Sequence, residues 1–191
     1  MRLNQPYRKL GRVDGFDALR AAVLELSDDV WLQDTSRQEI FSNVHGSTQT
    51  LVLLFCDGWP AVNVETRSAW DLLGEPALVV MKNVVSGSYK AGGRVIRAMV
   101  AKLPAGTVIN RHYDAHPSFS AAHRVHVPLI THQDVNFLIE EKRVPLEEGF
   151  AYEIDNLRLH EVKNLSPIDR LHFIFDYAPA DRLELQPSAG A

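Results

Sequence analysis

The second half of the chain consists of short segments rich in β-branched and aromatic residues, separated by turn-forming residues. Such segments predict β-strands at residues 95–102, 124–129, 135–139, 150–154, 159–162 and 171–177. Many short strands spaced by about 8–12 residues are typical of a sandwich, a barrel or a jelly roll. We therefore expect a core made mainly of β-structure.

Side chains alternate between two kinds of face in two of these strands. In the last strand, the large apolar residues point one way, and Arg170 and His172 point the other way. In the strand that begins at Arg124, the same alternation places Arg124 and His126 opposite three aliphatic residues. This pattern fits a jelly roll whose outer face is covered by helices and whose interior opens onto a polar site. A one-sided sheet with Arg and His in solvent is the alternative.

Helices are expected in the first third of the chain. Asp14 is positioned to cap a helix whose apolar residues follow a helical step, namely Phe16, Leu19, Val23 and Leu26. A second short helix is predicted at 66–73, closed by Gly74, with Trp70 on its buried face. Residues 77–85 are ambiguous between strand and helix, and 86–93 are predicted to be a flexible loop. Helices followed by strands indicate an α+β fold with a mainly β core.

The length of 191 residues fits one domain. We expect a single domain over 1–191, with a mixed helix and strand part over 1–90 and a jelly-roll core over 94–178 that carries the site. Residues 180–191 are expected to be a frayed tail.

Charge and cysteine content exclude several classes of protein. The net charge of −4 gives no general attraction to nucleic acid or to an anionic membrane. Cys56 is the only cysteine, which excludes an intrachain disulfide and any multi-cysteine metal site. The longest strongly apolar run, 51–56, is far shorter than the ~20 residues that span a membrane. The first residues contain no apolar signal segment, so we expect a soluble, cytoplasmic protein.

Histidine is distributed unevenly along the chain. Of eight histidines, seven lie between residues 112 and 172: His112, His116, His123, His126, His132, His160 and His172. The cluster is either a chance grouping of solvent-facing rings or a site for a metal or for proton transfer.

Two His-x-Asp pairs occur within this cluster. Residues two apart in a strand point the same way, so such a pair and a distant His can supply a facial iron triad of two imidazoles and one carboxylate. The pair His132 and Asp134 falls in a predicted hairpin turn, where a solvated role is expected. The pair His112 and Asp114 follows a predicted strand end and is the candidate for metal binding.

Four ordered motifs within 94–178 resemble the aspartyl/asparaginyl β-hydroxylase family. They are His112-x-Asp114, Arg124-Val-His126-Val-Pro-Leu129, Asp155-Asn-Leu-Arg-Leu-His160-Glu-Val and Asp169-Arg170-Leu-His-Phe-Ile-Phe. The family consists of Fe(II)- and 2-oxoglutarate-dependent oxygenases with a double-stranded β-helix. The resemblance implies this fold, and the two-faced strands predict that the N-terminal helices pack on its outer face.

The resemblance also implies roles for individual residues. It implies that iron is bound by His112, Asp114 and His160. It places Arg124 and His126 beside the C1 carboxylate of 2-oxoglutarate, and pairs Arg170 with the C5 carboxylate. The family's hydroxyl partner of the C5 carboxylate has no counterpart at 98–102, which lacks Ser and Thr.

Two further expectations concern the surroundings of His160. Asp155 and Asn156 are candidates to hold its imidazole, because a metal-bound His usually donates its other N–H, and an ordinary turn is the alternative. The stretch from His160 to Arg170 reads as a strand, a turn at 164–169 and the start of a neighbouring antiparallel strand, with both side chains entering one cavity.

The leading hypothesis is a dioxygenase that uses Fe(II), 2-oxoglutarate and O2 to hydroxylate a C–H bond of an amino acid or peptidyl side chain, releasing succinate and CO2. The alternative is a non-catalytic cupin-like ligand-binding or sensor module. A metal-dependent jelly-roll enzyme without 2-oxoglutarate is a third, disfavoured by the absence of a His-x-His pair. The partner is expected to be a small-molecule or peptidyl substrate. Its carboxylate could bind to the cations Arg94, Arg97 and Arg158. The alternative is that these three residues are solvated surface charges.

Overall fold

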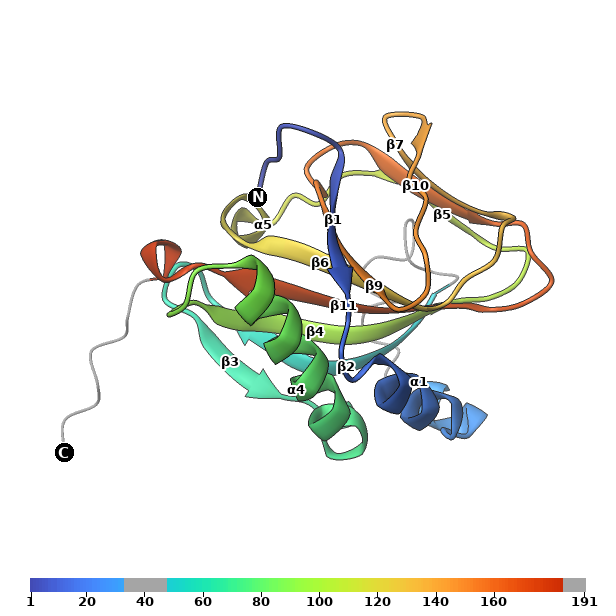
Figure 1. The fold of residues 1–191 in the computed structure, drawn as a ribbon, viewed down its shortest axis with the longest axis horizontal. Coiled ribbons are helices and arrows are strands. Elements are labelled where there is room, and N and C mark those ends of the chain that lie inside the picture. The colour runs from blue at the N-terminus through green and yellow to red at the C-terminus, as the bar shows by residue number, and fades with distance from the viewer. Residues whose placement is uncertain (33–47, 184–191) are drawn as a thin grey trace.

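A computed structural model describes residues 1–32 and 48–183. Their strands form two sheets that face each other, with every pairing antiparallel (Figure 1). The larger sheet contains, in spatial order, β1 (Tyr7–Arg12), β9 (Phe150–Ile154), β6 (His123–Ile130), β11 (Arg170–Ala178), β4 (Arg94–Leu103), β2 (Gln49–Asp57) and β3 (Asn63–Thr66). The smaller sheet contains β5 (Val108–His112), β10 (His160–Asn164), β7 (Val135–Ile139) and β8 (Lys142–Arg143).

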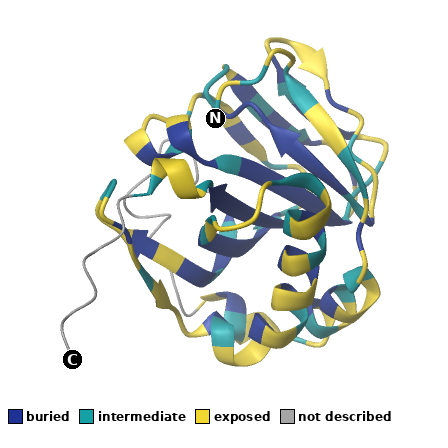
Figure 2. Cartoon of the chain, turned by 60° about the vertical axis from the view of Figure 1, so that its left-hand side comes forward, coloured by how far each residue is buried: buried dark blue, intermediate teal, exposed yellow. Residues whose placement is uncertain are grey.

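Two helices, α1 (Phe16–Leu24) and α4 (Ala69–Ser88), cover the outer face of the larger sheet (Figure 1). Leu19 of α1 and Val80 of α4 are completely buried in the same cluster as Phe173 of β11. The opposite faces of these helices are exposed, as the yellow bands in Figure 2 show. The mainly β core and the covered outer face confirm the predicted double-stranded β-helix.

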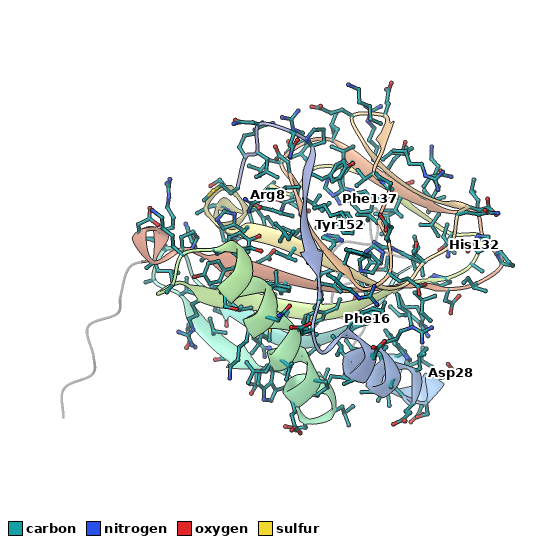
Figure 3. All side chains as sticks on the ribbon, viewed as in Figure 1. Arg8, Phe16, Asp28, His132, Phe137 and Tyr152 are labelled. Atoms are coloured by element: carbon teal, nitrogen blue, oxygen red, sulfur yellow. The ribbon has the colours of Figure 1, made fainter. Side chains whose placement is uncertain are left out.

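The space between the two sheets holds a second apolar cluster. Phe137 of β7 and Val162 of β10 pack there against Tyr152 and Ile154 of β9. Figure 3 labels Phe137 and Tyr152 in this interior. The inward face of β11 is polar in part, so the alternation seen in the sequence separates an apolar outer layer from a polar inner site.

All six predicted strands are present, and each boundary differs from the prediction by two residues at most. The sequence reasoning missed β1, β3, β5 and β8, and identified β2 only as an apolar run. That run is continuous because β2 lies between β3 and β4, and residues on both of its faces are buried.

The prediction that Gly74 ends a helix is wrong, because α4 continues through it to Ser88. Gly74 serves packing instead: a Cβ at this position would lie 2.8 Å from the ring of Trp70. Residues 77–85 are therefore helical, and the predicted loop at 86–93 begins after Ser88.

Asp14 does not cap α1, contrary to expectation. The helix begins after Gly15, which has a left-handed φ of 81° and lies so close to α4 that a Cβ would be 2.7 Å from Val79. The Asp14 carboxylate accepts a hydrogen bond from Nδ2 of Asn83 at 3.0 Å, so it connects α1 to α4. The expected apolar position at Leu26 lies beyond the end of the helix.

The remaining elements complete the described chain. Short helices occur at Asp28–Leu32 (η1), Pro117–Ala121 (α5) and Ala180–Arg182 (η2). No helix in the described ranges is long and apolar enough to cross a membrane. Most of the expected tail, 184–191, lies outside the described residues. The division of the chain into one domain with a site-bearing core stays a prediction.

One structural expectation about the site needs correction. β10 and β11 are not neighbours in one sheet: β10 pairs with β5 and β7, whereas β11 pairs with β4 and β6. His160 and Arg170 therefore face the interior from opposite sheets, which stack about 10 Å apart in sandwiches. The turn between them crosses from one sheet to the other.

Asn164 organises this turn. Its side chain is fully buried, and Nδ2 donates to the carbonyl oxygens of Leu103, Pro104 and Ile168 at 2.9–3.1 Å. Its Oδ1 accepts a hydrogen bond from the Ser166 hydroxyl at 2.6 Å. A single amide thus satisfies the backbone where the chain passes between the sheets.

We expect Asn164→Ala to lower the free energy of unfolding by about 2–4 kcal/mol, because it leaves several buried backbone groups without partners. Urea unfolding measures the change. The matched control is Asn63→Ala, at an exposed side chain that makes one exposed hydrogen bond, and it should stay within about 0.5 kcal/mol of the parent. Equal stability of the two variants would contradict the role given to Asn164.

Candidate active site

Two histidines meet in the smaller sheet because of strand register. β5 and β10 pair antiparallel with His112 directly opposite His160, and their ring centroids are 4.2 Å apart. Asp114 follows β5 by two residues, and its backbone N–H donates to the Asn156 carbonyl at 3.0 Å. One ligand atom from each of the three side chains lies within 4.8 Å of the others. The structure thus brings together the three predicted metal ligands.

Both imidazoles present the same nitrogen to this centre. The Nδ1 of His112 lies 2.7 Å from the Asn110 carbonyl oxygen, and the Nδ1 of His160 lies 2.9 Å from the Arg158 carbonyl oxygen. A carbonyl only accepts, so each Nδ1 carries a proton, and Nε2 is the nitrogen that each ring can offer to a metal. This arrangement is typical of metal-binding histidines.

Asp114 is held ionised beside the two rings. Its Oδ2 accepts hydrogen bonds from Nη1 of Arg124 at 2.6 Å and from Nδ2 of Asn156 at 2.8 Å. Burial alone would raise the pKa of Asp114, but Arg124, His160, Asn156 and His112 lower it to about 2. Two imidazoles and one carboxylate are a donor set that suits a divalent first-row metal.

The expected support of His160 by Asp155 and Asn156 is wrong in both cases. The His160 ring is held by the Arg158 carbonyl, and Asn156 orients Asp114 instead. Asp155 is fully buried and accepts from Nε of Arg158 at 3.0 Å, which secures the turn before β10.

Arg124 is bound by two carboxylates. Its Nε and Nη2 donate to Asp176 at 2.8 and 2.9 Å, and its Nη1 donates to Asp114. The role beside the C1 carboxylate that the resemblance implies for Arg124 stays a prediction. Sequence reasoning missed Asp176, although it shares the inward-facing parity of Arg170 and His172 on β11 and could have been found from it.

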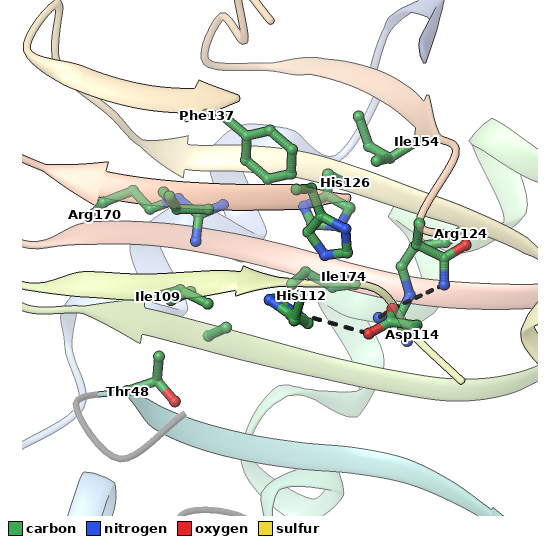
Figure 4. A pocket seen from close by; sticks show the side chains of 14 residues that line it. Thr48, Ile109, His112, Asp114, Arg124, His126, Phe137, Ile154, Arg170 and Ile174 are labelled. Carbon is green, nitrogen blue, oxygen red and sulfur yellow. Dashed lines mark hydrogen bonds and ion pairs between the residues drawn. The ribbon is translucent and has the colours of Figure 1, made fainter. Parts of the chain in front are cut away.

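Arg170 lies toward the other end of the cavity from Asp114, with His126 between them (Figure 4). Arg170 is only 2% exposed to solvent, and no carboxylate in residues 1–32 or 48–183 forms an ion pair with its guanidinium. Its Nη2 contacts Nδ1 of His172 at 2.5 Å, and its Nε has no partner within those ranges. Burial lowers the pKa of Arg170 to about 9, so it remains a cation at neutral pH.

Apolar and polar residues from both sheets line the remaining walls of this cavity. Figure 4 shows Phe137 above His126, and Ile109 and Ile174 close to the metal ligands. His126 is buried, and burial together with Arg170 and Arg124 holds its pKa well below the usual value.

Two threonines of the N-terminal part lie near the cavity and were missed from the sequence. Thr48 lines it, and Thr50 of β2 is the cross-strand neighbour of Ala101, which also lines it. Neither threonine belongs to 98–102, the stretch that lacks Ser and Thr. The alternate spacing of Thr48 and Thr50 at the start of an apolar strand was the available signal.

The other candidates lie elsewhere. His132 and Asp134 lie in the turn between β6 and β7, where the Asp134 N–H donates to Nδ1 of His132 at 3.2 Å; Figure 3 places His132 at the edge of the molecule. None of the three candidate substrate-reading cations lines the cavity. Arg97 pairs with Asp176, and Arg158 pairs with Asp155 and Glu140.

The fold and the two-histidine, one-carboxylate cluster define the class of Fe(II)- and 2-oxoglutarate-dependent oxygenases. Residues 76–179, more than half of the chain, match the sequence model of a family described as aspartyl/asparaginyl beta-hydroxylase. The chain belongs to this family and is an Fe(II)/2-oxoglutarate oxygenase family enzyme. A search of curated protein sequences found no significant match.

Solved structures share this fold at low sequence identity. HygX from Streptomyces hygroscopicus, with nickel and 2-oxoglutarate bound, is 14% identical with a TM-score of 0.54, over 95% of this chain and 85% of HygX. The non-heme monooxygenase ThoJ in complex with nickel is 15% identical with a TM-score of 0.54, over 91% of this chain and 73% of ThoJ. A Pseudomonas putida prolyl-4-hydroxylase is 13% identical with a TM-score of 0.50, over 92% and 93%.

We predict that His112→Ala and His160→Ala each weaken Mn²⁺ binding by more than about 100-fold, because even changes around metal ligands cost about 10–100-fold. Isothermal titration measures the affinity, and circular dichroism checks that the fold is kept. His132→Ala, in the other His-x-Asp pair, is the matched control and should bind like the parent. If His112→Ala and His160→Ala bound Mn²⁺ as tightly as the His132→Ala control, this metal site would be ruled out.

The metal-free protein should lose stability as the pH falls below about 6.5. Burial, first of all, holds the pKa values of His126 and His172 well below 6.5, so the unfolded chain takes up two protons that the folded chain does not. The free energy of unfolding, measured in urea with a chelator present, should be about 2–3 kcal/mol lower at pH 5.5 than at pH 7.5.

The variant His172→Asn should remove about half of this pH dependence, since it removes one of the two protons taken up on unfolding. His132→Asn changes a partly exposed ring and should leave the pH dependence as it is in the parent. A parent protein equally stable at both pH values would show that these rings are not buried in the neutral form.

Proposed function

We propose that this enzyme hydroxylates a C–H bond of an amino acid or peptidyl side chain, with Fe(II) held by His112, Asp114 and His160 and 2-oxoglutarate held between that site and Arg170. The observation that carries the proposal is the buried guanidinium of Arg170, which lines the cavity of the three ligands and has no carboxylate partner in residues 1–32 and 48–183. A buried cation without a partner is costly unless a ligand supplies the opposite charge.

The cavity suits a dicarboxylate with a metal-binding end. Three protein ligands gathered from one side leave positions free on an octahedral ion for a keto acid and O2. Arg170 offers a planar donor pair to a carboxylate at the far end. When bound, the iron supplies the oxidising chemistry that couples conversion of 2-oxoglutarate to succinate and CO2 with hydroxylation.

The protein's own groups prepare this site. Asn156 and Arg124 orient the Asp114 carboxylate, and the Asn110 and Arg158 carbonyls orient the two rings. Apolar side chains limit the access of water to the space between the ligands and Arg170; they are Ile109, Phe137, Val162 and Ile174. Asp176 fixes Arg124 by two hydrogen bonds, so that Arg124 approaches Asp114 from one direction.

The direct test is succinate formation from 2-oxoglutarate in the presence of Fe(II) and O2, with free amino acids and short peptides as candidate substrates. The proposal expects succinate to depend on the metal and to rise with one of these substrates. Binding of 2-oxoglutarate without any succinate would favour a ligand-binding or sensor module. Stimulation by peptides alone would exclude the free amino acids.

We expect Arg170→Ala to weaken 2-oxoglutarate binding to the Mn²⁺-loaded protein by roughly 30- to several-thousand-fold, because it removes one member of a buried charge pair. Mn²⁺ binding itself should change little. Arg170→Lys should recover part of the loss, since it restores the charge but not the two-pronged geometry. Unchanged 2-oxoglutarate affinity in the Ala variant would show that Arg170 does not bind the keto acid.

A further inference from the structure

In the described part of the chain, His172 is the one polar side chain that forms a hydrogen bond with the Arg170 guanidinium. The two residues lie two apart on the inward face of β11, and His172 is fully buried. A guanidinium only donates, so Nδ1 of His172 accepts the 2.5 Å hydrogen bond from Nη2 of Arg170. The imidazole is therefore neutral with its proton on Nε2, an atom that has no partner in the described part of the chain.

The His172 ring also lies at the boundary between two spaces. Arg170 lines the site cavity, whose volume is about 50 Å³. His172 lines a separate groove of about 650 Å³ between the turn at 131–135 and the segment 143–148. Phe137 lines both spaces, and His172 lines the groove and contacts Arg170, so these two side chains lie between the groove and the Arg170 end of the cavity.

Beside Arg170, the His172 ring packs edge to face against the cavity-lining ring of His126, with the centroids 5.7 Å apart, and its direct cross-strand neighbours are small. The cross-strand partners of His172 are Ala101 on β4 and Pro128 on β6. Both side chains are short, so a smaller residue at 172 would leave the site cavity open toward the groove. The ring is therefore placed both to hold Arg170 and to separate the cavity from the groove.

We propose that His172 is a positioning residue that fixes Arg170 and closes the far end of the cavity, so that the pocket accepts a five-carbon 2-oxo dicarboxylate and rejects a longer one. This inference rests on the proposed function and adds a determinant of co-substrate length. A closed wall of this kind typically discriminates one methylene by about 10–200-fold.

The test compares 2-oxoglutarate with 2-oxoadipate, which is one methylene longer, by isothermal titration into the Mn²⁺-loaded protein without O2. The parent should bind 2-oxoglutarate at least about tenfold more tightly than 2-oxoadipate. Binding is measured directly, so the result does not depend on turnover or on knowing the hydroxylated substrate.

Two variants separate the two roles of the ring. In His172→Asn, Oδ1 can still accept from Arg170 while the wall is shortened, so 2-oxoglutarate affinity should change little and the preference over 2-oxoadipate should fall at least about tenfold. In His172→Phe the wall is kept and the acceptor is lost, so 2-oxoglutarate should bind more weakly while the preference for the shorter acid remains.

The control is His132→Asn, at a histidine that lines the same groove without contacting Arg170, and both affinities should equal those of the parent. Thermal unfolding shows whether each variant folds. If one His172 variant does not fold, the binding measurements on the other one test the inference. Folded His172 variants that keep the parent's affinities and preference would overturn the inference alone. A metal-loaded parent that binds neither acid would overturn the proposed function beneath it.

Discussion

The cost of burying charge between two sheets governs this structure. An ion inside a protein is tolerated only when it is paired, and the interior here contains two guanidiniums with opposite circumstances. Arg124 is matched by Asp176 and Asp114, so its charge is balanced by the chain itself. Arg170 has no carboxylate partner within the described ranges. In the proposed function, this difference between the two arginines assigns the metal to the end of the pocket near Asp114 and a carboxylate of the keto acid to the end near Arg170.

Backbone register and a single turn create this pocket. The pairing of β5 with β10 places His112 opposite His160, and the turn held by Asn164 returns the chain to the other sheet as Arg170. The metal ligands and the cation consequently approach one cavity from two layers. Apolar residues on the outer face of β11, such as Phe173, pack against the helices. This packing holds the strand that carries Arg170 on its inner face.

The sequence predicted the strands, the ligand triad and the inward face of Arg170 because periodicity and motif order report on local geometry. It did not predict that His160 and Arg170 belong to different sheets, since a turn looks the same whether it joins neighbours or crosses between layers. Gly74 was misread because it makes room for the ring of Trp70, one turn earlier in the same helix. Asp14 was misread because its carboxylate binds Asn83 of α4 instead of the end of its own helix. The parity of β11 places Asp176 on the inward face, but its pairing with Arg124, 52 residues away along the chain, is a long-range contact that local patterns do not report.

The central claim is that one cavity binds a metal at the three ligands and a carboxylate at Arg170. A crystal structure of the protein grown without O2 in the presence of Mn²⁺ and 2-oxoglutarate tests it most directly. The account predicts one ion bound by His112, Asp114 and His160, with the keto acid extending from that ion to the Arg170 guanidinium. An ion bound at other residues, or a keto acid whose far carboxylate does not contact Arg170, would contradict it.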